Sequence, residues 1–157
     1  MVRKLEYATD KNIPGPYRIV FVSDLHFGGL FGTSYGETLV RRINEQKPDL
    51  VLLGGDMVDG DLPFVLQEGS LGTFRKLRST DGVYAVFGNH DKRLGSGAVE
   101  REFLEEEGVR FAVDENRMVN PWLNLTGMDD YLFGNRRADY HPEPGKFNVF
   151  MEHEPRR

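Results

Sequence analysis

Several short apolar runs occur along the chain, and each of them is followed by polar residues. Residues 17–22 (YRIVFV) follow Pro14-Gly15-Pro16, and residues 50–53 (LVLL) lie between Pro48-Asp49 and two glycines. β-Branched and aromatic residues favour strands, and a short run that is apolar throughout is typical of a strand covered on both faces. We therefore predict buried strands at both places. The same signals predict strands over residues 83–87, 122–125 and 147–151.

Three segments between these strands have a helical spacing of apolar residues. Ser34, with Glu37 three residues later, is typical of a capping box, and one apolar stripe follows as far as Lys47-Pro48. A weaker pattern, interrupted by glycines, predicts a helix over residues 64–77, and residues 100–107 predict another. We also expect a hairpin through residues 114–116, a solvated turn at 129–130 and a loop over 134–145.

Strands that alternate with helices through short connections predict an α/β fold, with a largely parallel sheet and flanking helices. Right-handed crossovers then bring the carboxyl ends of the parallel strands to one edge of the sheet. Polar residues that directly follow the strands should share that edge, where open α/β sheets bind their ligands.

Composition fits one soluble domain over residues 1–157. Twenty-five Asp and Glu against twenty Lys and Arg give a net charge of −5, so no clear nucleic-acid partner is expected. No apolar stretch approaches the ~20 residues that span a bilayer, which predicts a cytoplasmic chain. The chain has no cysteine, so a metal would be bound by imidazole, carboxylate or amide groups, which suit Mn, Fe or Zn.

Candidate metal ligands follow four of the predicted strands, and three of the chain's four histidines are among them. In isolation each group has an ordinary reading: Gly55-Asp56 is a common turn, and a polar tripeptide after a strand is a common loop. Their repetition after successive strands instead favours a metal site, in which a carboxylate such as Asp56 bridges two ions. The residues are Asp24 and His26, Asp56 and Asp59, Asn89 and His90, and His153.

Two cations held in this way would clamp a phosphate and activate a bridging water for in-line displacement. An imidazole that does not ligate an ion, such as that of His90, could protonate the leaving oxygen. The motifs themselves read Asp24-Leu25-His26, Gly55-Asp56-Met57-Val58-Asp59 and Gly88-Asn89-His90-Asp91, followed by His153. In this order they resemble the calcineurin-like metallophosphoesterase superfamily, especially its bacterial branch with membrane-associated phosphohydrolases.

The resemblance implies the N-terminal part of a four-layer αββα sandwich and hydrolysis of phosphomono- or phosphodiesters. It implies two divalent ions, with Mn expected first and Fe or Zn as alternatives. The implied substrates are phosphorylated small molecules or lipid-linked phosphates, and a membrane-associated full-length form is compatible with it.

The resemblance also implies a role for each site residue. Asp24 and His26 would bind the first ion, Asp56 would bridge, and Asn89 with His153 would bind the second. His90 would be the general acid. Asp59 would orient the His90 ring, and Asp91 would be structural.

One element of the family pattern, a terminal GHxH, has no counterpart here, because His141 lies in a proline-rich segment. We therefore expect a domain that is incomplete at its C-terminus, and the alternative function is an inactive fragment or a protein-interaction scaffold. Retention of Asp24, His26, Asp56, Asn89, His90 and His153 argues against a scaffold, whereas loss of the last element argues for one. A nuclease role is a further option, which the acidic balance disfavours.

Overall fold

The computed structural model describes residues 2–132 and 141–155, so most of the predicted loop over 134–145 lies outside the described residues. The first of two sheets is parallel throughout, in the order β1-β2-β3-β4. Its strands are β1 (Ile19–Val22), β2 (Leu50–Leu53), β3 (Val83–Ala85) and β4 (Val109–Phe111). This confirms the α/β class with a largely parallel sheet.

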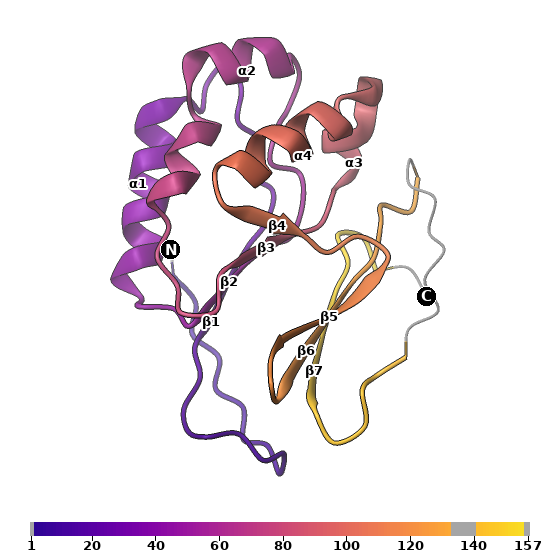
Figure 1. The fold of residues 1–157 in the computed structure, drawn as a ribbon. Helices are drawn as coiled ribbons and strands as arrows, with labels where there is room; N and C mark the ends of the chain where they lie inside the picture. Colours follow the sequence, from indigo (N-terminus) through magenta and orange to yellow (C-terminus); the bar gives the residue numbers. More distant parts are fainter. Residues whose placement is uncertain (1, 133–140, 156–157) are drawn as a thin grey trace.

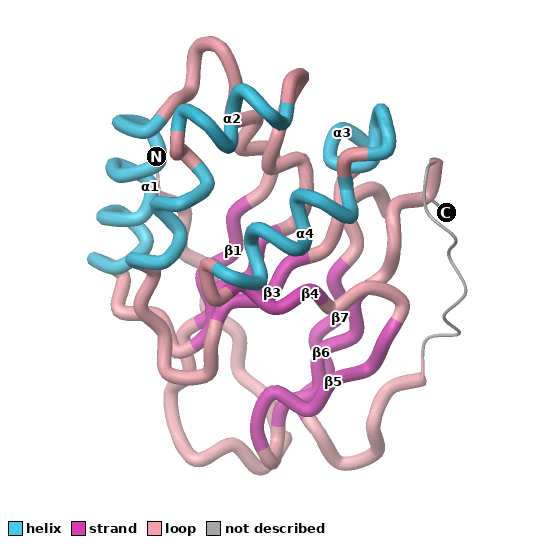
Figure 2. Tube along the Cα trace, turned by 45° about the horizontal axis from the view of Figure 1, so that its top comes forward, coloured by secondary structure: helices cyan, strands magenta, loops and turns pink. Residues whose placement is uncertain are grey.

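Helical segments connect the parallel strands, and they gather on the side of this sheet that is away from the second sheet (Figures 1 and 2). They are α1 (Thr33–Glu45), α2 (Leu62–Glu68), the 3-10 helix η1 (Leu71–Lys76), α3 (Asn89–Lys92), the 3-10 helix η2 (Arg93–Gly95) and α4 (Gly97–Glu106). No helix among the described residues is long and apolar enough to cross a bilayer.

The second sheet contains β5 (Glu115–Asn120), β6 (Leu123–Gly127) and β7 (Phe147–Met151). Strand β5 pairs with β6 antiparallel, whereas β7 pairs with β6 in parallel. The prediction of a strand over 147–151 is confirmed. It lies in this second sheet, however, and the fourth strand of the first sheet is β4, which the sequence analysis missed because β4 is only three residues long.

The core has two parts, one on each face of the first sheet. Along β2, Val51 and Leu53 face the helices, whereas Leu50 and Leu52 face the second sheet. This alternation follows from the two-residue repeat of a strand, and it explains why a strand between two layers is apolar throughout. The described residues therefore form three layers: the helices, the first sheet and the second sheet.

Two predictions about the helices are wrong. The capping box does not form, since α1 begins at Thr33 and its N-cap, Gly32, has no side chain. Instead a carboxylate oxygen of Glu68 in α2 accepts the Thr33 N–H at 2.6 Å. The predicted helix over 64–77 is divided into α2 and η1, because Gly69 has a left-handed φ of 84°.

The hairpin connects β5 to β6 and turns at Pro121 and Trp122, beyond the predicted 114–116. The side-chain oxygen of Asn120 accepts the N–H groups of Trp122 (3.1 Å) and Leu123 (2.9 Å), which stabilises the turn. Asp114, with a φ of 52°, instead lies where the chain passes from β4 in one sheet to β5 in the other.

Candidate metal centre

The loops that follow β1 and β2 are joined by backbone hydrogen bonds. The Asp24 N–H donates to the carbonyl of Gly55 and the His26 N–H to that of Asp56, each at 3.0 Å. Asp24, His26 and Asp56 all have left-handed backbones, with φ of 57°, 46° and 54°. Such conformations cost on the order of 1–3 kcal/mol each and collect at functional sites. The two loops therefore have a defined shape that sequence periodicity does not predict.

The Asp91 carboxylate binds the backbone of the loop that follows β2. It accepts the N–H groups of Asp56 (2.8 Å), Met57 (2.7 Å), Val58 (3.1 Å) and Gly88 (2.8 Å). The side chain is fully buried, and burial raises the pKa of the Asp91 carboxyl, while these backbone bonds lower it. The predicted structural role of Asp91 agrees with this geometry.

Glycine is needed where the β2 and β3 loops meet. A Cβ atom on Gly88 would lie 2.1 Å from the Oδ1 atom of Asp56, and one on Gly55 would lie 2.4 Å from the backbone nitrogen of Gly88. Gly55 also has a φ of 91°. Both motifs that begin with glycine thus permit a backbone approach that any side chain would prevent.

The first group of candidate ligands joins His26, Asp56 and His90, which each offer an atom within 4.8 Å of the other two. The Nε2 atom of His26 lies 3.8 Å from the Oδ2 atom of Asp56, and the His26 and His90 rings meet edge to face at 4.9 Å. The backbone N–H of His90 donates to Oδ1 of Asp56 at 2.9 Å. The loop after β3 is therefore joined to the loop after β2 at Asp56.

The second group joins Asp24, Asp56 and His153, again within 4.8 Å. The Nε2 atom of His153 lies 3.3 Å from Oδ2 of Asp56, and its Nδ1 atom lies 2.8 Å from the carbonyl oxygen of Gly54. A proton on Nδ1 donated to this carbonyl leaves Nε2 free as a ligand. His153 thus reaches the site from β7, in the second sheet.

Charge around His153 favours its protonated form. Burial lowers the pKa of His153, but the bond to Gly54 and the negative charges of Asp56, Asp24 and Asp91 together outweigh it and raise the pKa above 6.5. An imidazole in such a position can release its proton when a cation replaces it.

His90 has a carboxylate partner on its other side. Its Nδ1 atom lies 2.9 Å from Oδ1 of Asp59, whose side chain is 54% exposed. The second Asp59 oxygen lies 4.0 Å from Nδ1 of His26. The structure thus brings His90 and Asp59 together beside the carboxylate that both ligand groups share.

Asn89 begins α3 and is half-buried next to His90. The observed groups place His153 with Asp24, and His90 with His26. The ligand assignment implied by the resemblance pairs Asp24 with His26, so it stays a prediction.

The side chains in these two groups fit divalent metal ions. All of them offer imidazole nitrogen or carboxylate oxygen, the donors that suit Mn, Fe or Zn. The Nδ1 atom of His26 is buried and has no hydrogen-bond partner among the described residues. A buried polar atom without a partner is costly, and a bound ion is one way to satisfy it.

Two acidic residues that the sequence analysis placed in a solvated turn are buried, so that prediction is wrong. Asp129 and Asp130 are 4% and 2% exposed. Asp129 forms an ion pair with Lys92 of α3, whose ammonium group lies 4.9 Å from the ring centroid of Phe87. The contact connects the helix that begins with Asn89 to the second sheet. No sequence signal near Asp129 indicates this pairing, because the two residues are far apart in the chain.

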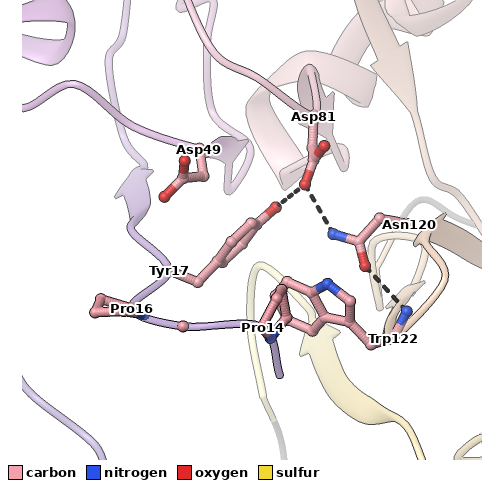
Figure 3. A pocket seen from close by; sticks show the side chains of 8 residues that line it. Pro14, Pro16, Tyr17, Asp49, Asp81, Asn120 and Trp122 are labelled. Atoms are coloured by element: carbon pink, nitrogen blue, oxygen red, sulfur yellow. Dashed lines mark hydrogen bonds between the residues drawn. The ribbon is translucent and has the colours of Figure 1, made fainter. Parts of the chain in front are cut away.

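A cavity of about 330 Å³ lies at the opposite edge of the sheets, where β1, β2, β3 and β6 begin and β5 ends. Figure 3 shows the side chains that line it. There Asp81 accepts hydrogen bonds from the Tyr17 hydroxyl (2.5 Å) and from the side-chain amide of Asn120 (2.7 Å), and Tyr17 meets Trp122 edge to face at 4.7 Å. Burial and the charge of Asp81 raise the pKa of Tyr17. This network ties one sheet to the other, away from the candidate ligands.

Comparison with known proteins agrees with the geometry. Residues 17–155 match the family model for calcineurin-like phosphoesterases. The chain is 28% identical over 150 residues to the metallophosphoesterase YkuE of Bacillus subtilis, covering 88% of this chain and 51% of that protein. It is 28% identical to the phosphodiesterase YaeI of Escherichia coli, covering 92% and 55%. A transmembrane protein with a metallophosphoesterase domain from Bos taurus is 29% identical, covering 72% and 27%.

The chain therefore spans about half or less of the length of these relatives. The match nevertheless extends over all the candidate ligands, from the loop after β1 to the loop after β7. Its motifs, its parallel sheet and its sequence relatives agree, and the chain belongs to the calcineurin-like phosphoesterase family.

Proposed function

We propose that this chain carries a binuclear metal site that hydrolyses phosphomonoesters or phosphodiesters, with His90 as the general acid. The observation that carries the proposal is the position of Asp56, which belongs to both groups of candidate ligands. A carboxylate can bridge two ions about 3.5–4 Å apart, and the Oδ2 atom of Asp56 lies near the imidazoles of both His26 and His153. Its burial, at 4% exposure, and its fixed backbone make Asp56 suitable as the shared ligand.

The proposed ligands are Asp24 and His26 for one ion, Asp56 for both, and Asn89 with His153 for the other. Mn is the first choice of metal, with Fe or Zn as alternatives, since all three accept this donor set. Bound ions would supply the charge that binds a phosphate and that lowers the pKa of a water to make a nucleophile.

The protein's own contribution to proton transfer would come from His90 and Asp59. If Nδ1 of His90 donates to the Asp59 carboxylate, Nε2 would be the atom that delivers a proton to the substrate. Transfer of the Nε2 proton to the leaving oxygen converts an alkoxide into an alcohol and leaves a neutral imidazole. Asp59 would act by fixing the orientation of the ring.

Phosphorylated small molecules or lipid-linked phosphates are the proposed substrates. The Escherichia coli relative is named a phosphodiesterase, and the Bos taurus relative is named a transmembrane protein. Together they support a phosphoester substrate, and membrane association of a full-length form.

Hydrolysis of a chromogenic phosphodiester with added Mn²⁺ tests this proposal. We expect turnover by the wild type, loss of at least ~100-fold in Asp56→Asn, and no change in Asp10→Asn, which alters an exposed carboxylate outside the motifs. A folded wild-type protein that neither binds metal nor turns over substrate would contradict the proposal and favour a scaffold.

A further inference from the structure

The ion pair between Lys92 and Asp129 lies beyond the carboxyl ends of β3 and β6, and it is largely buried. The Lys92 side chain is 19% exposed and that of Asp129 is 5% exposed. Lys92 is the last residue of α3, the helix that begins with Asn89 and His90, whereas Asp129 follows β6 in the second sheet. The pair therefore connects α3 to the sheet that contributes His153.

Each side chain of the pair is held in place by its surroundings. The Oδ2 atom of Asp129 accepts a hydrogen bond from the Lys92 ammonium group, while its Oδ1 atom accepts the N–H of Asp130 at 2.9 Å. The ammonium group also lies 4.9 Å from the centroid of the Phe87 ring. A Cβ atom on Gly97 would lie 3.3 Å from Cγ of Lys92, so the apolar stem packs against the start of α4. The contact thus has one defined geometry.

Asp129 lies beside the segment that carries His153. The N–H of Met128, the residue before Asp129, donates to the carbonyl of Met151 at 2.9 Å. Met151 ends β7, and His153 follows two residues later. Both α3 and His153 contact the Asp56 carboxylate, from different layers of the fold. A shift of α3 relative to Asp129 therefore also changes the distance between α3 and His153.

A buried ion pair such as that of Lys92 and Asp129 adds little stability compared with an apolar pair of similar size, because both charges lose their hydration. Its geometry is restrictive, however, since a displaced charge would be buried without a partner, which is costly. Buried polar pairs of this kind are best known as devices that fix the register between structural elements. Stability alone therefore does not account for a charged pair between α3 and the second sheet.

We propose that Lys92 and Asp129 are positioning residues, whose ion pair sets the distance between α3 and His153. The pair thereby holds Asn89 and His90, at the start of α3, opposite the ligand from the second sheet. Neither Lys92 nor Asp129 belongs to the two groups of candidate ligands, so the pair acts through the placement of α3. The inference rests on the proposed function, which gives α3 and His153 their roles at the metal centre.

Amide hydrogen exchange of the metal-free protein tests this role. The double variant Lys92→Met/Asp129→Leu replaces both charges by apolar groups, a change that usually preserves stability. The His90 N–H donates to Oδ1 of Asp56 at 2.9 Å and reports whether α3 keeps its place. In the double variant this amide should exchange ~10-fold faster, relative to the amides of β2. Wild-type exchange at His90 in the folded double variant would overturn the proposal.

Asp129→Asn decides the proposal if the double variant does not fold. It removes the charge but keeps an oxygen for the N–H of Asp130, and it should also raise the exchange of the His90 amide.

Asp81→Leu is the matched control, because it removes the acceptor that connects Tyr17 to Asn120 across the sheets at the opposite edge. The control should lower the midpoint of urea unfolding and leave the relative exchange of the His90 amide unchanged. An equal increase at His90 in Asp81→Leu would overturn the specific role of the Lys92–Asp129 pair.

Calorimetry with Mn²⁺ measures the consequence for the metal site, at a temperature where every variant is folded. The double variant should bind Mn²⁺ ~10-fold or more weakly, the usual effect of residues that orient metal ligands, and Asp81→Leu should bind it as the wild type does. Equal affinity in the wild type and the double variant would overturn the positioning role. A wild-type protein that binds no Mn²⁺ would refute the metal site itself, whereas hydrogen exchange, which needs no metal, would still decide whether the pair positions α3.

Discussion

The Nδ1 atom of His90 lies 2.9 Å from a carboxylate oxygen of Asp59, although 31 positions separate the two residues in the chain. Asp59 belongs to the loop after β2, and His90 to the start of α3 after β3. Because parallel strands end at the same edge, two loops from neighbouring strands can hold one ring between them. The contact fixes which nitrogen of His90 faces away from Asp59 and is available for proton transfer.

His90→Gln should therefore lower turnover most for substrates with a poor leaving group. We expect a loss of ~10²–10⁴-fold with a phenyl or alkyl phosphodiester, and a smaller loss with a p-nitrophenyl ester, whose leaving group needs no proton. Steady-state kinetics with a series of leaving groups measure the difference. His141→Gln, which changes an exposed histidine, is the control. If His90→Gln lowered turnover equally for all leaving groups, His90 would not be the general acid.

Gly88→Ala should weaken metal binding although it alters no ligand. The added Cβ would meet Oδ1 of Asp56 at 2.1 Å, so the carboxylate or its loop has to move. Overpacking of this kind typically costs about 1–3 kcal/mol of stability. Calorimetry with Mn²⁺ should give an affinity at least ~10-fold lower. Gly15→Ala provides the matched control, because a Cβ there meets nothing within 4 Å. Wild-type affinity in both variants would show that the close approach of Gly88 to Asp56 is unimportant for metal binding.

The stability of the metal-free protein should depend on pH through His153. Its pKa is raised on folding, so protonated His153 stabilises the folded state fully below pH 6.5, and this stabilisation is lost as pH rises through the folded-state pKa. His153→Gln should remove this part of the slope in urea unfolding between pH 5.5 and pH 8.5, and His141→Gln should not. An unchanged slope in His153→Gln would contradict the assignment of the raised pKa.

Glu68 should stabilise α1 as a cap supplied by another helix. The Thr33 N–H lowers the pKa of Glu68, so this contribution is present above pH 4.5 and is lost as pH falls through the folded-state pKa. Glu68→Ala should cost about 1 kcal/mol at pH 7, typical of a lost helix cap, and less at pH 3. Thermal unfolding measures both values, with the exposed neighbour Gln67→Ala as reference. A cost that is the same at both pH values would argue against a charged cap.

Sequence reasoning predicted what depends on local pattern. The apolar run at residues 50–53 indicated a strand covered on both faces, and β2 is buried along its whole length. The rule that parallel strands end at one edge predicted that Asp24 and His90 lie close to Asp56, and the structure places both of them beside it.

Features that depend on distant contacts were not predictable in this way. The cap of α1 comes from Glu68, 35 residues from Thr33, so the local signal at Ser34 was misleading. Likewise His153 arrives from a second sheet, and the partner of Lys92 is a buried Asp129. In each case the tertiary structure provides a better partner than the nearby sequence does.

Electron paramagnetic resonance of the Mn²⁺-loaded protein can detect whether two ions share the Asp56 carboxylate. Two ions bridged at about 3.5–4 Å are coupled magnetically. We expect two Mn²⁺ per chain with a spin-coupled spectrum that disappears in Asp56→Asn. A spectrum of isolated Mn²⁺ ions, or one that is the same in the variant, would contradict it.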